Sequence, residues 1–167
     1  LADLLAVMNK ESNNLYAEQI FRTYGWAGSV RGGANRTERF MRRAGVNTRD
    51  ILVRDGSGLS RKDLITPEAM VQMLIHMDAH RERAAFLSSL PLGGERGSTL
   101  EYRLRNRPVR AKTGSLRFIR SLSGYATRPD GRRVAFALFA NNYTGPSYRV
   151  TNAFDEVVAI LTASSVS

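Results

Sequence analysis

The stretch between residues 108 and 142 constrains the fold of this chain more than any other part of the sequence. It contains three strand-like segments, and the compact turn Pro129-Asp130-Gly131 joins the last two as a hairpin. From Val134 to Ala140 both sides of the alternating pattern are apolar, so both faces of the predicted strand are covered. The three predicted strands span residues 108–115, 119–127 and 133–142. We therefore expect an antiparallel sheet that lies between other layers of structure.

Helical patterns precede and follow these strands. Thr66-Pro67-Glu68 is the clearest helix start, because it combines a capping hydroxyl, a proline at the first position and an acid in the first turn. That helix is predicted to continue to about His80. Further helical patterns cover residues 1–24, with an interruption at 12–14, and residues 35–44 and 147–162, whereas 28–33 and 93–94 are predicted loops. Residues 1–167 are thus expected to form one α+β unit, an antiparallel sheet flanked by helices.

The composition excludes some classes of site and leaves others open. The chain has 167 residues, a formal charge of +10 and no cysteine. The absence of cysteine excludes disulfides, thiolate metal sites and a cysteine nucleophile, and no apolar run is long enough to span a membrane. Most of the positive charge comes from 22 arginines spread along the chain. Such a charge is compatible with nucleic acid, an anionic membrane or an anionic polymer as a partner, but scattered arginine does not identify the ligand.

The first candidate for chemistry is Lys112-Thr113-Gly114, which lies in the first predicted strand. Its ammonium and hydroxyl groups can hold a substrate carboxylate, and Gly114 leaves room for a peptide to approach the strand. A free strand edge can also pair with that peptide as an added strand. The alternative is an ordinary exposed lysine that precedes a Thr-Gly turn.

Two further polar motifs lie upstream of this strand. Ser12-Asn13-Asn14 stands at a predicted helix start, where a hydroxyl can relay a proton and an amide can hold a substrate carbonyl. The alternative is that Ser12 or Asn14 only caps the helix. Asp55-Gly56-Ser57-Gly58, taken by itself, is a glycine-rich turn before a capped helix.

In this order, the three motifs resemble those of the serine penicillin-recognising enzymes, which combine Ser-x-x-Lys, Ser-x-Asn and Lys-Thr-Gly. The local sequences are similar to the D-alanyl-D-alanine carboxypeptidase/endopeptidase family, the class C penicillin-binding proteins. The similar segments run from Val7 to Asn14, from Asp55 to Arg61, from Leu64 to Pro67, from Ala111 to Leu116 and from Leu122 to Ala126. The resemblance implies a β-lactamase/transpeptidase-like fold, also called the penicilloyl-serine fold.

The resemblance also implies a reaction and roles for individual residues. Such an enzyme is a serine-type hydrolase that acts on peptidoglycan stem peptides ending in D-Ala-D-Ala through an acyl-enzyme, and β-lactams inhibit it. Ser12 would relay a proton to the leaving amine, Asn14 would bind the substrate amide and Lys112 would support proton transfer. Thr113 would bind the substrate carboxylate, and the backbone N–H of Ser115 would form half of an oxyanion hole. No metal or other cofactor is implied, and the substrate places such a protein in the periplasm or another extracytoplasmic site.

The sequence departs from this family at the nucleophile. None of the three lysines, Lys10, Lys62 and Lys112, has a serine three positions earlier, so these 167 residues contain no Ser-x-x-Lys motif. In the family this motif lies upstream of Ser-x-Asn, together with part of the sheet. We therefore expect this chain to hold two of the three catalytic motifs and to show no turnover by itself. We also expect an incomplete sheet, whose exposed edge permits self-association.

Other interpretations remain open at this stage. One is a cell-wall remnant that binds D-Ala-terminated peptides without forming an acyl-enzyme. Another is a basic nucleic-acid-binding protein, although no motif indicates a specific nucleic acid. His76 and His80 have the spacing of a helical zinc pair, but Met77 replaces the glutamate of His-Glu-x-x-His and there is no third histidine. Residues 93–99 lack the lysine of a phosphate loop, so we expect a surface loop there.

Overall fold

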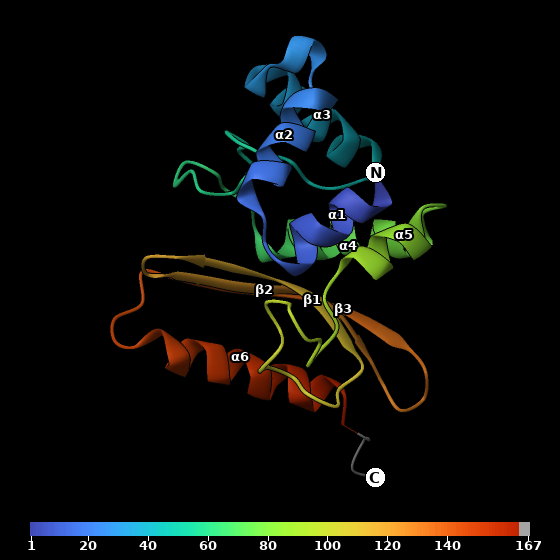
Figure 1. The fold of residues 1–167 in the computed structure, drawn as a ribbon, viewed down its shortest axis with the longest axis vertical. Helices are drawn as coiled ribbons and strands as arrows, with labels where there is room; N and C mark the ends of the chain where they lie inside the picture. Colours follow the sequence, from blue (N-terminus) through green and yellow to red (C-terminus); the bar gives the residue numbers. More distant parts are fainter. Residues whose placement is uncertain (164–167) are drawn as a thin grey trace.

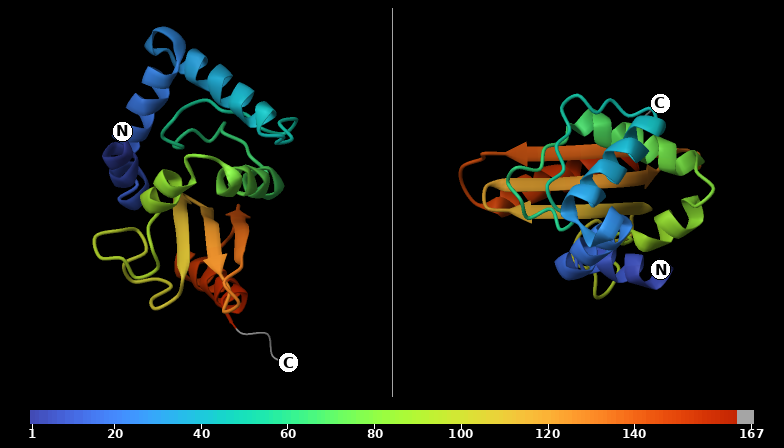
Figure 2. Two further views of the ribbon diagram at one scale, coloured as in Figure 1. Left: turned by 90° about the vertical axis from the view of Figure 1, so that its right-hand side faces the viewer. Right: turned by 90° about the horizontal axis from the view of Figure 1, so that it is seen from above.

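A three-stranded antiparallel sheet separates two layers of helices (Figure 1). Its strands are β1 (Val109–Leu116), β2 (Ile119–Thr127) and β3 (Arg133–Asn141), in the order β1-β2-β3. Helix α6 (Ser147–Leu161) covers one face, and α4 (Pro67–Ala79) packs against the other (Figures 1 and 2). The computed structural model describes residues 1–163, the side chain of Ala27 excepted. The expected α+β architecture, with both faces of the sheet covered, is confirmed.

The main hydrophobic core lies between the sheet and α6. Alternate residues of the strands face α6 because side chains along a strand point to opposite faces in turn. The core contains Val109, Ala111, Leu122, Ala126, Phe136 and Val158, together with Leu100 and Leu104 from the segment before β1. A smaller core under α4 is built around Leu74, Leu90 and Tyr125, whose hydroxyl donates to the Leu74 carbonyl at 2.6 Å.

The N-terminal part of the chain forms the helices above the sheet. These are α1 (Ala2–Lys10), α2 (Asn14–Tyr24), the short 3-10 helix η1 (Trp26–Gly28) and α3 (Val30–Arg43). Figure 2 shows α2 and α3 meeting at an angle, with η1 at their junction. No helix within residues 1–163 is both long enough and apolar enough to cross a membrane.

The sequence-based prediction was wrong about the start of α3. Residues 28–33 were expected to form a loop, but the helix begins at Val30, after Ser29 caps it by accepting a hydrogen bond from the Gly32 N–H at 3.0 Å. A Cβ on Gly33 would lie 2.7 Å from the Phe21 carbonyl oxygen of α2. Glycine is therefore needed here for close helix packing, and not to form a turn.

Two local features had no counterpart among the predicted elements. The chain forms a further short helix, α5 (Arg83–Ser89). Leu52 pairs with Leu64 in an isolated bridge. The hairpin between β2 and β3 is confirmed, because the Gly131 N–H donates to the Arg128 carbonyl across the predicted turn at 2.9 Å.

The segment between α5 and β1 covers only part of the outer edge of the sheet. The Gly93 N–H donates to the Val109 carbonyl at 2.9 Å, and the Ala111 N–H donates to the Pro91 carbonyl at 3.1 Å. These bonds pair the first part of β1 with residues 91–93 and stop at Ala111. The second part of β1 thus keeps a free edge in the described structure.

Candidate active site

The three sequence motifs meet in one cleft of about 830 Å³ between the helical layer and the sheet. Ser12 and Asn14 come from the junction of α1 and α2, and the loop after residue 55 forms another wall. Strand β1 contributes the remaining wall. The motif residues that line the cleft are Ser12, Asn13, Asn14, Gly56, Ser57, Gly58, Lys112, Thr113, Gly114 and Ser115.

Ser12 and Lys112 form the central contact of this cleft. They are 100 residues apart in sequence, and the Lys112 Nζ donates to the Ser12 Oγ at 2.8 Å. The same nitrogen also donates to the Thr113 carbonyl at 2.7 Å. Ser12 holds a φ of 57°, a left-handed conformation that is uncommon outside glycine and that turns the chain sharply between α1 and α2. A strained residue of this kind is frequent in functional sites.

The electrostatics of the pair follow from burial. Burial lowers the pKa of Lys112 from its ordinary 10.5 to about 8. About one Lys112 side chain in ten is then neutral at pH 7, against about one in three thousand at the ordinary pKa. A lysine with this pKa can both give and accept a proton near neutrality.

The two asparagines that follow Ser12 differ in their contacts. Asn13, not Ser12 or Asn14, caps α2, because its side chain accepts a hydrogen bond from the Tyr16 N–H at 3.0 Å. The alternative in which Ser12 or Asn14 serves as the cap is therefore wrong. Asn14 is exposed, and its side chain makes no hydrogen bond within residues 1–163, so its amide remains available on the cleft wall.

The free edge of β1 presents backbone donors to the cleft. In an antiparallel strand, the N–H and C=O groups of alternate residues point to the same side. The backbone N–H and C=O groups of Val109 and Ala111 point away from β2, toward residues 91–93. The backbone groups of Thr113 and Ser115 therefore point to the same outer side. Within the described chain the N–H groups of Thr113 and Ser115 have no acceptor. Two donors thus lie next to Lys112 at an edge that can pair with a peptide.

Gly114 leaves room for a side chain of the neighbouring strand. It lies opposite Ser121 in the register of β1 and β2. A Cβ at this position would lie 2.2 Å from the Ser121 Oγ. The Ser121 hydroxyl therefore occupies the space beside Gly114 on the cleft floor, which the sequence reasoning missed because register cannot be read from β1 alone.

The loop of residues 55–61 is shaped by its own first residue and anchored to α2. The Asp55 carboxylate accepts hydrogen bonds from the Gly58 N–H at 2.6 Å and the Ser60 N–H at 2.9 Å, so it holds the turn and does not itself line the cleft. The Gly56 N–H donates to the Glu18 carboxylate at 2.8 Å. That hydrogen bond, followed by the one from Arg22, lowers the pKa of Glu18.

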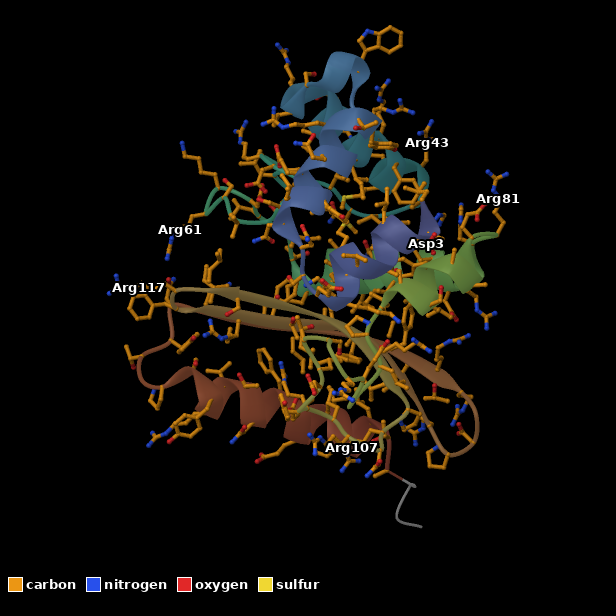
Figure 3. The ribbon with its side chains drawn as sticks, viewed as in Figure 1. Asp3, Arg43, Arg61, Arg81, Arg107 and Arg117 are labelled. Atoms are coloured by element: carbon orange, nitrogen blue, oxygen red, sulfur yellow. The ribbon has the colours of Figure 1, made fainter. Side chains whose placement is uncertain are left out.

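A contact across the cleft joins this loop to the β1–β2 turn. The Arg61 guanidinium donates to the Arg117 carbonyl at 3.1 Å, and both side chains reach outward at the same end of the molecule in Figure 3. The sequence motif includes Arg61, but nothing in its spacing indicated this bridge. The contact limits how far the loop and the strand can separate.

A second set of contacts fixes the end of α1 that carries Ser12. The Lys10 Nζ lies 2.6 Å from the Glu95 Oε1, and the Asn9 amide donates to the Ser89 Oγ at 2.9 Å. Glu95 also accepts from the Leu92 N–H at 2.8 Å. Burial raises the pKa of Glu95, but the bonds from Lys10 and Leu92 outweigh it and hold this pKa below its usual value. These residues tie α1 to the segment that pairs with β1.

The histidine pair and the loop of residues 93–99 were the two other candidate sites in the sequence. The rings of His76 and His80 lie 5.5 Å apart, and the Nδ1 of His80 accepts a hydrogen bond from the Glu82 N–H. Among residues 1–163, no group of three side chains of the metal-binding types comes together. Residues 93–99 form the expected loop, and its Glu95 accepts a hydrogen bond from the Lys10 Nζ at 2.6 Å.

Comparison with known proteins agrees with this geometry. A model of the D-Ala-D-Ala carboxypeptidase 3 (S13) family matches residues 1–163. The chain is 33% identical over 159 residues to a D-alanyl-D-alanine carboxypeptidase of Actinomadura sp. (strain R39), and this match covers 88% of the chain and 29% of that protein. The chain thus spans about a third of the length of the curated relatives it matches.

Solved structures show the same similarity in three dimensions. Penicillin binding protein 4 (dacB) from Haemophilus influenzae, in complex with a β-lactam, matches with a TM-score of 0.83 and 28% identity, over 97% of this chain and 41% of that one. TLA-1 extended spectrum β-lactamase matches with a TM-score of 0.75 and 20% identity, over 96% of this chain and 62% of its own. The expected β-lactamase/transpeptidase-like fold is therefore confirmed.

Proposed function

This chain belongs to the D-Ala-D-Ala carboxypeptidase 3 (S13) family, and we propose that it forms the substrate-binding and proton-transfer part of a serine-type D-Ala-D-Ala carboxypeptidase or endopeptidase. The proposed substrates are peptidoglycan stem peptides that end in D-Ala-D-Ala, and the proposed inhibitors are β-lactams. Because cross-linked peptidoglycan lies outside the cytoplasmic membrane, the proposed location is extracytoplasmic.

The observation that carries this proposal is the hydrogen bond between Lys112 and Ser12 beside a free strand edge. An amine with a pKa of about 8 lies against a hydroxyl, in a cleft of sufficient size for a peptide end. The unpaired N–H groups of Thr113 and Ser115 lie on the same edge. This set provides proton transfer, carboxylate binding and oxyanion stabilisation within one site.

In the proposed reaction the substrate pairs with the free edge of β1. The terminal carboxylate lies near the Lys112 ammonium and the Thr113 hydroxyl, and the Asn14 amide binds the peptide amide. The scissile carbonyl oxygen accepts a hydrogen bond from the Ser115 N–H. Such a donor contributes roughly 3–4 kcal/mol to the transition state, because it meets the charge that develops on that oxygen.

Formation of the acyl-enzyme then requires a serine from a Ser-x-x-Lys segment, which these 167 residues do not contain. The hydroxyl proton of this serine passes to the lysine of that segment, which relays it toward Lys112 and Ser12. The serine oxygen bonds to the carbonyl carbon, and the bond from that carbon to the nitrogen of the last D-Ala breaks. The Ser12 hydroxyl passes a proton to the departing amine and regains one from the Lys112 side. Water hydrolyses the resulting ester and restores the serine.

A second candidate function follows from the absence of Ser-x-x-Lys in this chain. The cleft and the free edge are present without a nucleophile, so the chain alone can act as a peptide-binding unit that forms no acyl-enzyme. The two candidates differ in turnover and not in binding.

Release of D-alanine from a peptide distinguishes the enzyme from the peptide-binding unit. The substrate is a diacylated Lys-D-Ala-D-Ala tripeptide, and the control peptide ends in L-Ala. We expect a form of the chain extended upstream by a Ser-x-x-Lys segment to release D-alanine from the first peptide only, and the 167-residue chain to bind it without release. Absence of release by the extended form, with selective binding retained, would favour the peptide-binding unit. Equal binding of both peptides would contradict both candidates.

A further inference from the structure

The arginines of α3 are concentrated on one side of that helix, away from the candidate active site. Of its 14 residues five are arginine and one, Glu38, is acidic. At about 100° per residue these arginines fall within an arc of about 140°, while the apolar residues of α3 occupy the other side, against α2. All five are exposed, and they are Arg31, Arg36, Arg39, Arg42 and Arg43.

Little negative charge offsets this face. Glu38 is already paired with Arg42 at 2.6 Å, and on α2 Glu18 is paired with Arg22 at 2.7 Å. Arg31, Arg39 and Arg43 have no ion-pair partner within the described residues. The outer face of α3 therefore presents a concentrated positive charge, which distinguishes it from the arginines scattered elsewhere.

An aromatic side chain lies beside the start of α3. Trp26, in η1, is 83% exposed, the highest value among the large hydrophobic side chains of the described chain. It is the only tryptophan in the sequence. A side chain of this size gains hydrophobic free energy when another surface covers it, so Trp26 is available to contribute to docking. Tryptophan next to basic residues is typical of contact with the interface of a lipid bilayer.

The position of this surface allows docking without blocking the cleft. The junction of α2 and α3 forms the end of the molecule farthest from the sheet, with α6 at the other end (Figures 1 and 2). Arg43 projects outward from this part of the molecule, whereas Arg107 lies near α6 (Figure 3). None of the α3 residues lines the cleft.

We propose that η1 and the arginine face of α3 dock the protein peripherally on a membrane rich in anionic phospholipid. The arginines supply attraction to the headgroups, and Trp26 inserts at the interface. Polyphosphate and duplex nucleic acid offer the same charge but no accessible apolar boundary for the tryptophan, and single strands offer only stacking on separate bases. A bilayer provides both the charge and a continuous apolar boundary. This proposal does not rest on the proposed enzymatic function, and neither its success nor its failure changes that function.

The test follows the fluorescence of Trp26 as the chain is titrated with vesicles of phosphatidylglycerol and phosphatidylcholine, or of phosphatidylcholine alone. We expect a blue shift and protection from a soluble quencher only with the anionic vesicles, and reversal by salt. A triple variant, Arg31→Gln, Arg39→Gln and Arg43→Gln, should lower the partition coefficient on the order of a hundredfold.

The matched control removes the same charge elsewhere, through Arg96→Gln, Arg107→Gln and Arg149→Gln, which are exposed and lie outside α3. It should lower the partition coefficient by less than about threefold, since distant charges are screened. Circular dichroism verifies that both variants fold. Equal losses in the two triples would overturn the proposal in favour of net charge alone. No vesicle binding, or equally tight binding to polyphosphate or DNA without a shift of Trp26 emission, would overturn it as well.

Discussion

Replacing Lys112 with methionine should stabilise the fold while removing the central group of the candidate site. The free energy follows from the lowered pKa of Lys112. A shift of this pKa from 10.5 to about 8 means that keeping Lys112 charged lowers the free energy of unfolding by at most about 3.4 kcal/mol. Partial exposure reduces the cost, and the two hydrogen bonds of the ammonium are lost, so we expect a gain of about 1–3 kcal/mol at pH 7.

The pH dependence of this gain gives the prediction its sharpest form. Between pH 8 and pH 10.5 the unfolded chain still binds a proton at Lys112, whereas the folded chain has lost it. The stability contributed by this site therefore rises with pH across that window. Methionine cannot titrate, so the advantage of Lys112→Met should shrink between pH 8 and pH 10.5. Contributions of the other groups cancel in the difference.

Urea unfolding followed by far-ultraviolet circular dichroism, at pH 7, 8, 9 and 10, measures this difference directly. Lys62→Met is the matched control for the substitution itself, because Lys62 is exposed. Only three lysines are present, so ¹³C NMR of the lysine side chains can also give the pKa of Lys112 itself. A Lys112→Met variant less stable than the wild type, or a difference constant from pH 7 to pH 10, would refute the reasoning.

Three further predictions concern the walls of the cleft. Gly114→Ala places a Cβ 2.2 Å from the Ser121 Oγ, a hydroxyl that can rotate away, so it should cost about 1 kcal/mol or less in urea unfolding, and adding Ser121→Ala should remove that loss. Gly56→Ala brings a Cβ to 2.3 Å from the Phe21 Cβ and should destabilise the protein by about 1–3 kcal/mol, with no single side-chain truncation able to rescue it. Because the pKa of Glu18 is lowered in the folded state, its contribution to stability is present above its ordinary value of 4.5 and is lost as the pH falls through the folded pKa; Glu18→Gln should flatten that acid limb of the stability curve.

The elements that the sequence predicted well are those with strong local signals. The Thr66 cap, which accepts from the Ala69 N–H, and the turn at Gly131 each place a specific chemical requirement on neighbouring residues. The error at the start of α3 arose because glycine has two uses, to permit unusual backbone angles and to allow close packing. The sequence of Gly32 and Gly33 does not distinguish these uses, and only the approach of α2 does.

The candidate site was only partly predictable for a similar reason. Each motif could be recognised locally, but the contact between Lys112 and Ser12 depends on how two distant segments fold together. The roles assigned to the motif residues came from family resemblance and remain predictions. The supporting bonds of Glu18 and Glu95 had no sequence signal, because a single glutamate on a helix or in a loop is usually solvated.

Intact-mass spectrometry after incubation with penicillin tests the central claim most directly, namely that Ser12 and Lys112 belong to a site whose nucleophile is a serine of a Ser-x-x-Lys segment. The samples are the 167-residue chain, a form extended upstream by such a segment, and that form with Ser12→Ala. We predict no adduct on the 167-residue chain and a penicilloyl adduct on both extended forms, formed more slowly after Ser12→Ala. An adduct on a serine of the 167-residue chain, or no adduct on either of the other forms, would contradict the claim.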